Sequence, residues 1–317
     1  MPLATEPTLP HIGHALARLD DFGAHDISAA VVIDVEGHPI LGAVSDEGRI
    51  VAFVPLEPDA GLEPLGFDLG TVTTGIDDKE IDLEGVTVHN GALVAIGSLS
   101  FKRRRVKDKH DLEEALERLA KVGKASGGKR THSDHAYVLQ PRLDHGRLTV
   151  DFVRRIEVRS HLAELPLLAP FATLPSKDNG LDVEGLTFHE GSFYLGLRGP
   201  VLRGQALLVR TTSDFESPTL LPLGLDGWGI RAVTPRGPGE LWVVSGPTMA
   251  HPGPFTLWRV EPHATPRPKA TRMGELAVPG AGKVETVFAY RGTLHILVDG
   301  LAGGDPRTVL RCDAALG

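Results

Sequence analysis

The chain has 317 residues, of which 41% are hydrophobic and 23% charged, and its formal net charge is -8. This balance is typical of a globular protein and excludes a disordered chain. A net negative chain repels phosphate backbones, so nucleic acid is not the expected partner. The single cysteine, Cys312, excludes an intramolecular disulfide and favours a reducing, cytoplasmic setting. No apolar run approaches the length of a membrane span, and the N-terminus has no secretory pattern, so we expect neither membrane insertion nor secretion.

The 37 glycines and 24 prolines separate short apolar runs, which predicts many strands joined by tight turns. Five strand–turn–strand hairpins are predicted in chain order, at residues 26–47, 81–93, 181–193, 229–246 and 283–300. Further strands are predicted after three of them, at residues 49–56, 64–71, 134–140, 147–155, 255–260 and 272–278. Near the two chain ends, HALARLDDF at 14–22 and RTVLRC at 307–312 are predicted to pair as outer strands.

One segment predicts a helix. Leu112, Leu116 and Leu119 form an i, i+4, i+7 stripe, and Asp108 or Asp111 can cap its start. This helix belongs to a basic insertion at residues 102–130, which we expect within the second hairpin unit.

The hairpins repeat one pattern. IDLEGVTVHNGAL at 81–93 matches LDVEGLTFHEGSF at 181–193 without gaps, and Glu285 continues the pattern in a third copy. The two weaker copies place Arg231 and Ser28 where the others have glutamate. A repeated hairpin is typical of the inner strands of propeller blades. The sequence therefore predicts an all-β chain that forms one β-propeller domain over residues 1–317.

Five blades are predicted, and six are the alternative because about twice the usual spacing separates the second and third hairpins. The helical insertion and a proline-rich stretch account for that excess without a sixth hairpin. A β-sandwich is a further alternative, although sandwiches rarely repeat a whole hairpin in register.

Several motifs resemble a bacterial β-propeller family known as domain-of-unknown-function family 3616. They are SDE (45–47), DLEGV (82–86), GSLSFKRRR (97–105), EGLTFHEGSFYLGLRGPVLRGQAL (184–207), GWGIRAV (227–233) and SGPTM (245–249). This resemblance implies the fold and no particular reaction. The layout is also loosely similar to calcium-dependent apyrases, in which Ser and Glu side chains from the innermost strands of five blades meet a metal ion. The equivalent positions here are Ser28, Glu84, Glu184, Arg231 and Glu285, and Arg231 departs from the pattern.

If the repeats are blades, Glu84, Glu184 and Glu285 face one space at the axis. Clustered carboxylates repel one another and need a counter-charge, a proton or a metal. Arg231 supplies one positive charge, and a Ca²⁺, Mg²⁺ or Mn²⁺ ion with Ser28 as a further ligand would supply the rest. The alternative is an Arg–Glu network that plugs the tunnel. We expect these glutamates and Arg231 to carry any catalysis, and we expect no organic cofactor.

The start of the first strand and the end of the second strand of a hairpin lie at the same end. Side chains that follow the second strands should therefore form a mouth beside the axial residues. The mouth residues predicted to bind substrate are Asp46, Glu47, Ser98, Arg103, Arg198 and Arg203. Arginine suits phosphate and carboxylate groups, so the mouth predicts an anionic small molecule. His89 and His189 fall at the opposite end, where structural roles are expected.

These observations favour a monomeric, metal-dependent hydrolase that acts on a phosphorylated or otherwise anionic small molecule at the mouth. One alternative is a non-catalytic propeller that binds a ligand or docks a partner protein through the insertion at 102–130. Another is a lactonase-like sugar-acid enzyme, by analogy of fold alone.

Overall fold

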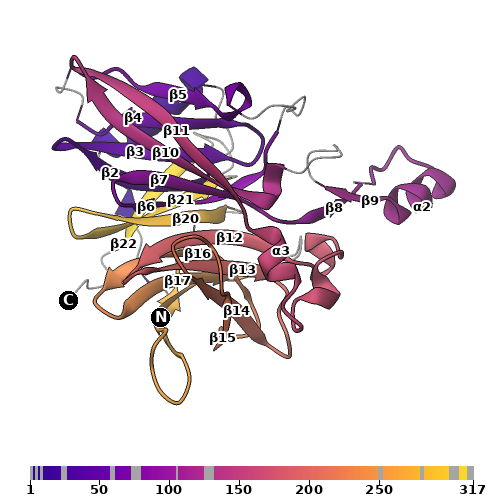
Figure 1. Ribbon diagram of the computed structural model, residues 1–317. Helices are drawn as coiled ribbons and strands as arrows, with labels where there is room; N and C mark the ends of the chain where they lie inside the picture. Colours follow the sequence, from indigo (N-terminus) through magenta and orange to yellow (C-terminus); the bar gives the residue numbers. More distant parts are fainter. Residues whose placement is uncertain are drawn as a thin grey trace.

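The computed structural model is mostly strand and describes the greater part of the chain (Figure 1). The described residues are 3, 6–7, 10–22, 27–57, 61–72, 80–104, 106–124, 132–248, 253–278, 282–299 and 307–312.

The described strands form five four-stranded antiparallel sheets and one two-stranded ribbon. The first sheet comprises β2 (Ile27–Val35), β3 (His38–Ser45), β4 (Ile50–Pro55) and β5 (Leu65–Asp68). The second comprises β6 (Leu83–His89), β7 (Ala92–Gly97), β10 (His135–Asp144) and β11 (Arg147–Glu157). The third comprises β12 (Asp182–His189), β13 (Ser192–Gly199), β14 (Gln205–Thr211) and β15 (Thr219–Gly224). The fourth comprises β16 (Gly229–Gly237), β17 (Glu240–Gly246), β18 (Thr256–Glu261) and β19 (Lys269–Glu275). The fifth comprises β20 (Lys283–Tyr290), β21 (Thr293–Asp299), β22 (Arg307–Cys312) and β1 (Glu6–Pro7).

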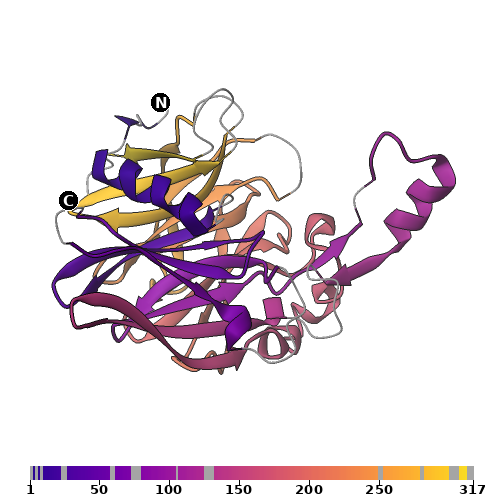
Figure 2. The same cartoon turned by 90° about the horizontal axis from the view of Figure 1, so that it is seen from above.

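The sheets are arranged around a central axis (Figure 2). Each inner strand contacts the inner strands of two neighbouring sheets, which closes a ring in the order β2, β6, β12, β16, β20 and back to β2. The five predicted hairpins form the two inner strands of the five sheets, and the described residues contain no sixth four-stranded sheet. The predicted all-β propeller is confirmed.

The hydrophobic core lies between neighbouring sheets. Ile40 and Val51 of the first sheet, for example, share one buried cluster with Leu93 and Tyr137 of the second. Alternating side chains of each strand thus pack against one neighbour or the other. None of the helices in the described part of the chain is long and apolar enough to cross a membrane.

The prediction of an outer strand at residues 14–22 is wrong. These residues belong to α1 (Pro10–Ala17) and the 3-10 turn η1 (Arg18–Phe22). Ile12, Leu16 and Leu19 repeat with helical spacing, and all three are buried against the first and fifth sheets. β22 pairs with β21 on one side and with β1 on the other. The two ends of the chain therefore do meet in one sheet, but the N-terminal strand is Glu6–Pro7 and not residues 14–22.

The remaining outer strands were predicted close to their observed places. The strands β4, β5, β10, β11 and β18 are confirmed, whereas β19 begins at Lys269, three residues before its predicted start. The register of β19 against β18 shifts between Leu257 and Trp258, which marks a bulge. Residues 269–271, which precede the predicted start, pair with residues 259–261 past this bulge.

The long interval between the second and third hairpins contains an arm and several short turns. The arm comprises β8 (Phe101–Arg103), α2 (Leu112–Ala120) and β9 (Val122–Lys124), and it projects from the body of the molecule (Figures 1 and 2). It is inserted between β7 and β10 of the second sheet, as predicted, and residues 125–131 lie outside the described residues. The short helical turns of this interval are η4 (His132–Asp134), α3 (Arg159–Ala163), η5 (Ala169–Phe171) and η6 (Ser176–Asp178), whereas η3 (Leu69–Thr71) follows β5 of the first sheet.

Candidate functional site

Every inner strand carries a β-bulge near its start. In each sheet the register against the second strand skips one residue, and that residue is the one aligned by the sequence repeat. The skipped residues are Ser28, Glu84, Glu184, Arg231 and Glu285. A bulged residue leaves the hydrogen-bonded ladder, and its side chain takes a direction that regular pleating does not allow. The repeat therefore encodes one re-aimed side chain in each sheet.

Two of the bulged glutamates are followed by a glycine, and close packing explains why a glycine is present there. A Cβ atom at Gly85 would lie 2.8 Å from Cβ of Leu186, and one at Gly185 would lie 3.0 Å from Cγ1 of Val233. The inner strands of neighbouring sheets thus approach more closely than a side chain permits at these points. In each Glu-Gly pair, the bulge turns the glutamate side chain out of the regular strand pattern, and the glycine lets the neighbouring inner strand pack closely.

Arg231 forms an ion-pair network with two of the bulged glutamates. Its Nη1 lies 2.5 Å from a carboxylate oxygen of Glu184, and its Nη2 lies 3.0 Å from one of Glu285. Arg231 is 7% exposed and Glu184 is 5% exposed. These two predicted metal ligands therefore face a buried arginine, as the alternative of an Arg–Glu network anticipated.

Arg198 completes this network from β13. Its guanidinium pairs with the second carboxylate oxygen of Glu184 and lies 2.5 Å from Oδ2 of Asp182. Burial opposes the charged form of Arg198, but Asp182, Glu184 and Glu84 raise the pKa of its guanidinium above the ordinary value. Arg198 is thus engaged by buried carboxylates, which differs from the predicted role of holding a substrate anion.

Ser28 is buried and joins two sheets. Its hydroxyl donates to the backbone oxygen of Leu83, and the backbone oxygen of Val44 lies 3.3 Å away. Ser28 was predicted as a metal ligand, but its hydroxyl hydrogen is donated to the backbone oxygen of the residue before Glu84.

Glu84 has surroundings unlike those of the other bulged glutamates. Among the described residues, no lysine or arginine forms an ion pair with it. Burial raises the pKa of the Glu84 carboxyl well above the ordinary value, and the nearby carboxylates of Glu184, Asp82 and Asp46 raise it further. Among the described residues, Glu84 is therefore the bulged glutamate without an ion-pair partner.

Glu84 lies in a group of three carboxylates that we name the acidic cluster. Asp46, Asp82 and Glu84 each offer an oxygen, and these oxygens all lie within 4.8 Å of one another. Asp46 follows β3 of the first sheet, whereas Asp82 and Glu84 lie at the start of β6 in the second. The cluster thus spans the junction between two sheets.

Lys102 borders the acidic cluster. Its Nζ lies 2.5 Å from Oδ1 of Asp82, and its side chain is 42% exposed. Burial of part of the side chain opposes the charge, but Asp82, Glu84 and Asp46 together raise the pKa of the Lys102 ammonium. Since Lys102 belongs to β8, a positive charge from the base of the arm partly compensates the cluster.

Two strained backbone positions flank the hydrogen bonds of Asp82. Asp82 has φ 61° and Leu99 has φ 57°, in the left-handed region that a bulky residue such as leucine rarely adopts. Between them, Ser98 donates its hydroxyl to Asp82, and its Oγ lies 2.9 Å from Oγ of Ser100. The strained turn thus brings the Ser98 hydroxyl and Lys102 to the Asp82 carboxylate, and the Ser100 hydroxyl to that of Ser98.

Asp182 occupies the position in β12 that Asp82 occupies before β6. Burial raises the pKa of Asp182 to about 7, Arg198 and Arg231 oppose the shift, and Glu184 and Asp82 add to it. The protonation of this carboxyl therefore changes near neutral pH.

The remaining predicted mouth residues lie in separate surroundings. Arg103 contacts Asp178 and the backbone oxygen of Leu119, so it holds the arm. Arg203 is exposed at a loop position with φ 51°, and Glu47 is exposed beside Ser45, whose Oγ accepts from its backbone N–H. Of the predicted substrate-binding set, Asp46 belongs to the acidic cluster and Ser98 contacts it through Asp82.

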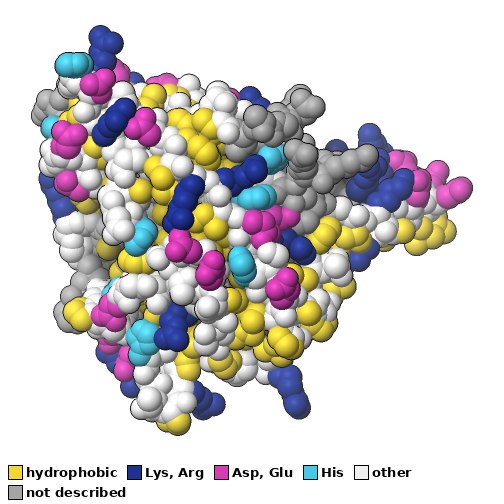
Figure 3. All heavy atoms as spheres, viewed as in Figure 1, with side chains coloured by type: hydrophobic (Ala, Val, Ile, Leu, Met, Phe, Trp, Pro, Cys, Tyr) yellow, Lys and Arg dark blue, Asp and Glu magenta, His cyan; other side chains and the backbone are white. Residues whose placement is uncertain are grey.

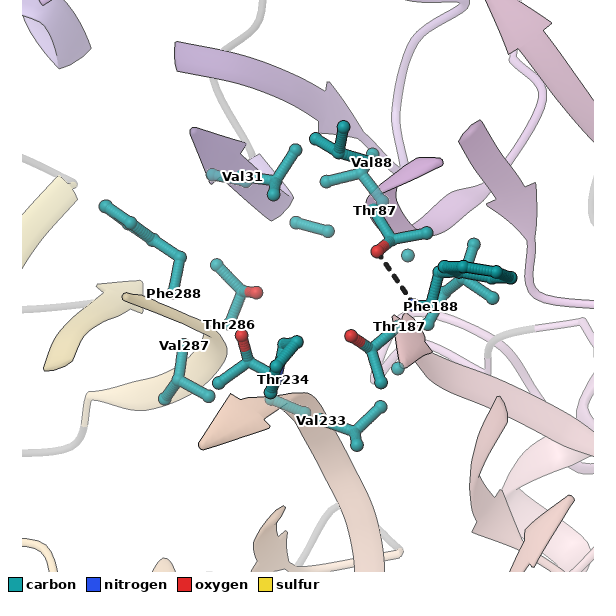
Figure 4. Close-up of a pocket in the computed structure, with 18 of the residues that line it drawn as sticks. Val31, Thr87, Val88, Thr187, Phe188, Val233, Thr234, Thr286, Val287 and Phe288 are labelled. Carbon is teal, nitrogen blue, oxygen red and sulfur yellow. Dashed lines mark hydrogen bonds between the residues drawn. The ribbon is translucent and has the colours of Figure 1, made fainter. Parts of the chain in front are cut away.

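An axial cavity of about 240 Å³ extends from Glu84 and Glu184 along the inner strands (Figure 4). The hydroxyls of Thr187, Thr234 and Thr286 point into it, whereas Thr87 accepts a hydrogen bond of 3.0 Å from the backbone N–H of Phe188. Its other labelled lining side chains are apolar, namely Val31, Val88, Phe188, Val233, Val287 and Phe288. The propeller axis therefore contains a cavity that begins beside its charged residues.

His89 packs against aromatic side chains, with its ring centroid 4.0 Å from that of Phe188. Burial lowers the pKa of the His89 imidazole, which favours its neutral form. The contact agrees with the structural role expected for this residue.

This geometry defines a β-propeller with a carboxylate-rich pocket at one end of its axis. The chain belongs to the family described as "Protein of unknown function (DUF3616)", whose model matches residues 63–278. No curated protein matches the sequence.

Several solved structures are remotely similar to this chain. A Trypanosoma rangeli sialidase in complex with the inhibitor DANA is 10% identical, with a TM-score of 0.44 over 92% of this chain and 56% of that one. A putative oxidoreductase (glucose dehydrogenase) from Thermus thermophilus is 13% identical, with a TM-score of 0.47 over 98% and 99%. A GH43 β-1,3-galactosidase with galactodeoxynojirimycin is 11% identical, with a TM-score of 0.48 over 90% of each chain. This chain thus spans little more than half of the sialidase, and such remote likeness says nothing of its reaction.

Three residues of the site were missed as functional candidates. Asp82 and Asp182 lie two residues before the repeated glutamates, so their recurrence in the aligned hairpins was the available signal. Lys102 lies in a run of four basic residues that reads as a solvated loop, and nothing in that run distinguishes it.

Proposed function

We propose that this protein is a hydrolase that holds a divalent cation in the acidic cluster and acts on an anionic small molecule there. The observation that carries the proposal is the close grouping of Asp46, Asp82 and Glu84, with Glu84 lacking a positive partner among the described residues. At a ligand distance of about 2.4 Å, two oxygens on opposite sides of a Ca²⁺ ion are about 4.8 Å apart. The spacing of the three carboxylates is therefore compatible with a shared ion.

The donor set favours a hard cation. Carboxylate oxygens suit Ca²⁺, Mg²⁺ and Mn²⁺, whereas the described residues bring no histidine or cysteine to the acidic cluster. When bound, such a cation polarises a substrate oxygen and lowers the pKa of a coordinated water. The ligand set proposed here retains Glu84 from the prediction and replaces Ser28, Glu184 and Glu285 by Asp46 and Asp82, because the first three are engaged elsewhere.

The chain's own residues have distinct parts in this proposal. Lys102 is the partly exposed positive group beside the acidic cluster, so it is suited to contact an anionic group of the substrate. Arg231 and Arg198 fix Glu184 next to Glu84, which keeps a negative charge beside the cluster. Ser98 orients Asp82 through its hydrogen bond.

A binding role without turnover is the second candidate. The axial cavity supports it, because threonine hydroxyls and apolar side chains line a space open to a small molecule next to Glu84. The acidic cluster would then anchor a cation or a cationic group of the ligand.

The cation site can be tested by calorimetric titration of chelator-treated protein with Ca²⁺, Mg²⁺ and Mn²⁺. We expect Asp82→Asn and Glu84→Gln each to weaken binding by at least about tenfold, because each removes a charged ligand. Asp151→Asn, which changes an exposed carboxylate on β11, is the matched control and should bind as the wild type does. Absence of cation binding to the wild type would refute the proposal.

Turnover is tested with the same proteins. We expect a panel of phosphate esters and other anionic esters to reveal hydrolysis that depends on the added cation and is lost in Glu84→Gln. Tight cation binding without turnover on any of these substrates would instead favour the binding role.

A further inference from the structure

Three threonine hydroxyls in the axial cavity have no hydrogen-bond partner among the described residues. Thr187, Thr234 and Thr286 are 2%, 7% and 7% exposed, and their hydroxyls point into the cavity (Figure 4). A buried hydroxyl without a partner is destabilising, so such groups normally meet water or a ligand. The three residues belong to the inner strands of three successive sheets, so their hydroxyls surround one space.

The sequence repeat explains why Thr187 is left without a protein partner. Thr87 holds the equivalent position in the second sheet, and its hydroxyl accepts the backbone N–H of Phe188 across the sheet junction at 3.0 Å. The residue equivalent to Phe188 in the next sheet is Pro235, which has no N–H to donate. Proline is tolerated there because this side of β16 is its free edge. The hydroxyl of Thr187 is therefore available to another partner.

The charge of the cavity indicates which partner fits. Among the described residues that line it, the charged ones are Glu84 and Glu184. Glu184 is paired with Arg198 and Arg231, whereas Glu84 has no ion-pair partner in the described part of the chain. The cavity therefore repels an anion and favours a cationic group beside Glu84. On the outer face seen in Figure 3, by contrast, acidic and basic side chains are interspersed.

The size and walls of the cavity restrict the rest of the ligand. At about 30 Å³ for each water-sized group, a volume of about 240 Å³ holds about eight non-hydrogen atoms. The other labelled side chains are apolar, among them Val31, Val233 and Phe288. Thr187 follows Glu184 by three residues, so the hydroxyls and the carboxylates lie at levels about 10 Å apart along the strands. A short alkyl chain with a polar group at each end fits this arrangement.

We propose that the axial cavity binds a small amino alcohol, that is, a primary ammonium group joined by a short alkyl chain to a hydroxyl group. The ammonium group lies at Glu84, the alkyl chain lies between the apolar side chains, and the hydroxyl group bonds to Thr187. This site belongs to the binding role given above as the second candidate and rests on it. Its occupation requires neither a divalent cation nor turnover.

The ligand class can be tested by calorimetric titration of the full chain with 5-aminopentan-1-ol in the presence of a chelator. We expect a dissociation constant of about 1 mM for a ligand of this size. Pentane-1,5-diol replaces the ammonium group by a hydroxyl group, so it should bind at least about tenfold more weakly. Absence of binding by the amino alcohol, or equal binding of the two compounds, would overturn the proposal.

The residues are tested with the same titration. Thr187→Val removes the hydroxyl at nearly constant volume and should raise the dissociation constant about fivefold, and Glu84→Gln should raise it at least about tenfold. Thr256→Val is the matched control, since Thr256 is 1% exposed on β18 and does not line the cavity. Because Thr187 has no protein partner, thermal unfolding should find Thr187→Val at least as stable as the wild type. Unchanged affinity in Thr187→Val would contradict the assignment.

A repeat of the titration with saturating Ca²⁺ in place of the chelator separates this site from the proposed cation site. Both use Glu84, so a bound cation should weaken the binding of the amino alcohol at least about tenfold. Binding of the amino alcohol that Ca²⁺ leaves unchanged would count against the cation site alone. Failure of the amino alcohol to bind in the chelator, with Ca²⁺ binding intact, would refute the present proposal alone.

Discussion

Glu184 and Arg231 occupy the same bulge position in neighbouring sheets, and their side chains form an ion pair of 2.5 Å. The repeat therefore places opposite charges at equivalent points. Because both residues lie outside the strand ladder, their side chains reach across the sheet junction without disturbing the backbone hydrogen bonds.

Replacement of Arg231 by Met should destabilise the fold. It leaves Glu184 and Glu285 at the axis without their shared guanidinium, and removal of one partner from a buried ion pair usually costs about 3–5 kcal/mol. The free energy of unfolding is measured by urea denaturation. Arg272→Met removes exposed ion pairs on β19 and should change stability by at most about 1 kcal/mol. Equal effects of the two substitutions would contradict the importance of the axial network.

Gly185→Ala should also destabilise the protein. The new methyl group would lie 3.0 Å from Cγ1 and 3.1 Å from the backbone nitrogen of Val233, so the two inner strands must separate, at a cost of about 1–3 kcal/mol. Gly13→Ala is the contrasting variant, because Gly13 lies in α1 with nothing within 4 Å of the added Cβ. Alanine there should stabilise the protein by about 0.5–1 kcal/mol. Thermal unfolding of both variants would detect the opposite signs.

Stability should fall as pH rises toward neutrality. The pKa of Asp182 is raised to about 7 in the folded chain, from about 3.9 in an unfolded one, so the native state binds more protons in this interval. The resulting stabilisation is complete below about pH 4 and is lost as pH rises to about 7, with a slope of about 1 kcal/mol per pH unit. The raised pKa of Glu84 acts in the same direction.

The contribution of Asp182 is isolated by comparing Asp182→Asn with the wild type in urea denaturation between about pH 5 and about pH 8. The amide cannot ionise, so the variant should show a smaller decline in stability over this range. If the decline is as steep in the variant, the proton is not held by Asp182.

Cation binding should release protons. Because the pKa of Glu84 is raised well above its ordinary value, a cation that needs the carboxylate form displaces the proton it holds. Calorimetric titration in two buffers of different ionisation enthalpy measures this release, which should disappear in Glu84→Gln. Binding with no proton release in the wild type would remove Glu84 from the ligand set.

Sequence alone located much of the fold and part of the site. The recurring Glu-Gly pairs placed Glu84, Glu184 and Glu285 at one end of the axis, because strand repeats fix register. They could not show which glutamate has no ion-pair partner among the described residues, since that depends on how far Arg198 and Arg231 reach across the junction. The place of Lys102 depends on the strained turn at Leu99, which no local pattern encodes.

The predicted and observed helices depend on the spacing of apolar residues along the sequence. The leucines of α2, with Asp108 or Asp111 as the expected cap, predicted a helix that the structure confirms with Asp111 as the cap. The residues of α1 were mistaken for a strand because their helical spacing spans little more than two turns. The cytoplasmic setting, which rests on the single cysteine and the lack of a secretory pattern, stays a prediction.

The bulges also bear on how such a protein can change. Since a bulged residue contributes no rung to the ladder, its identity is nearly independent of the hydrogen bonds that define the sheet. Serine, glutamate and arginine already alternate at this position within one chain. The backbone pairing therefore tolerates different residues at the bulge, whereas the ion pairs between sheets require that Arg231 and its glutamate partners change together.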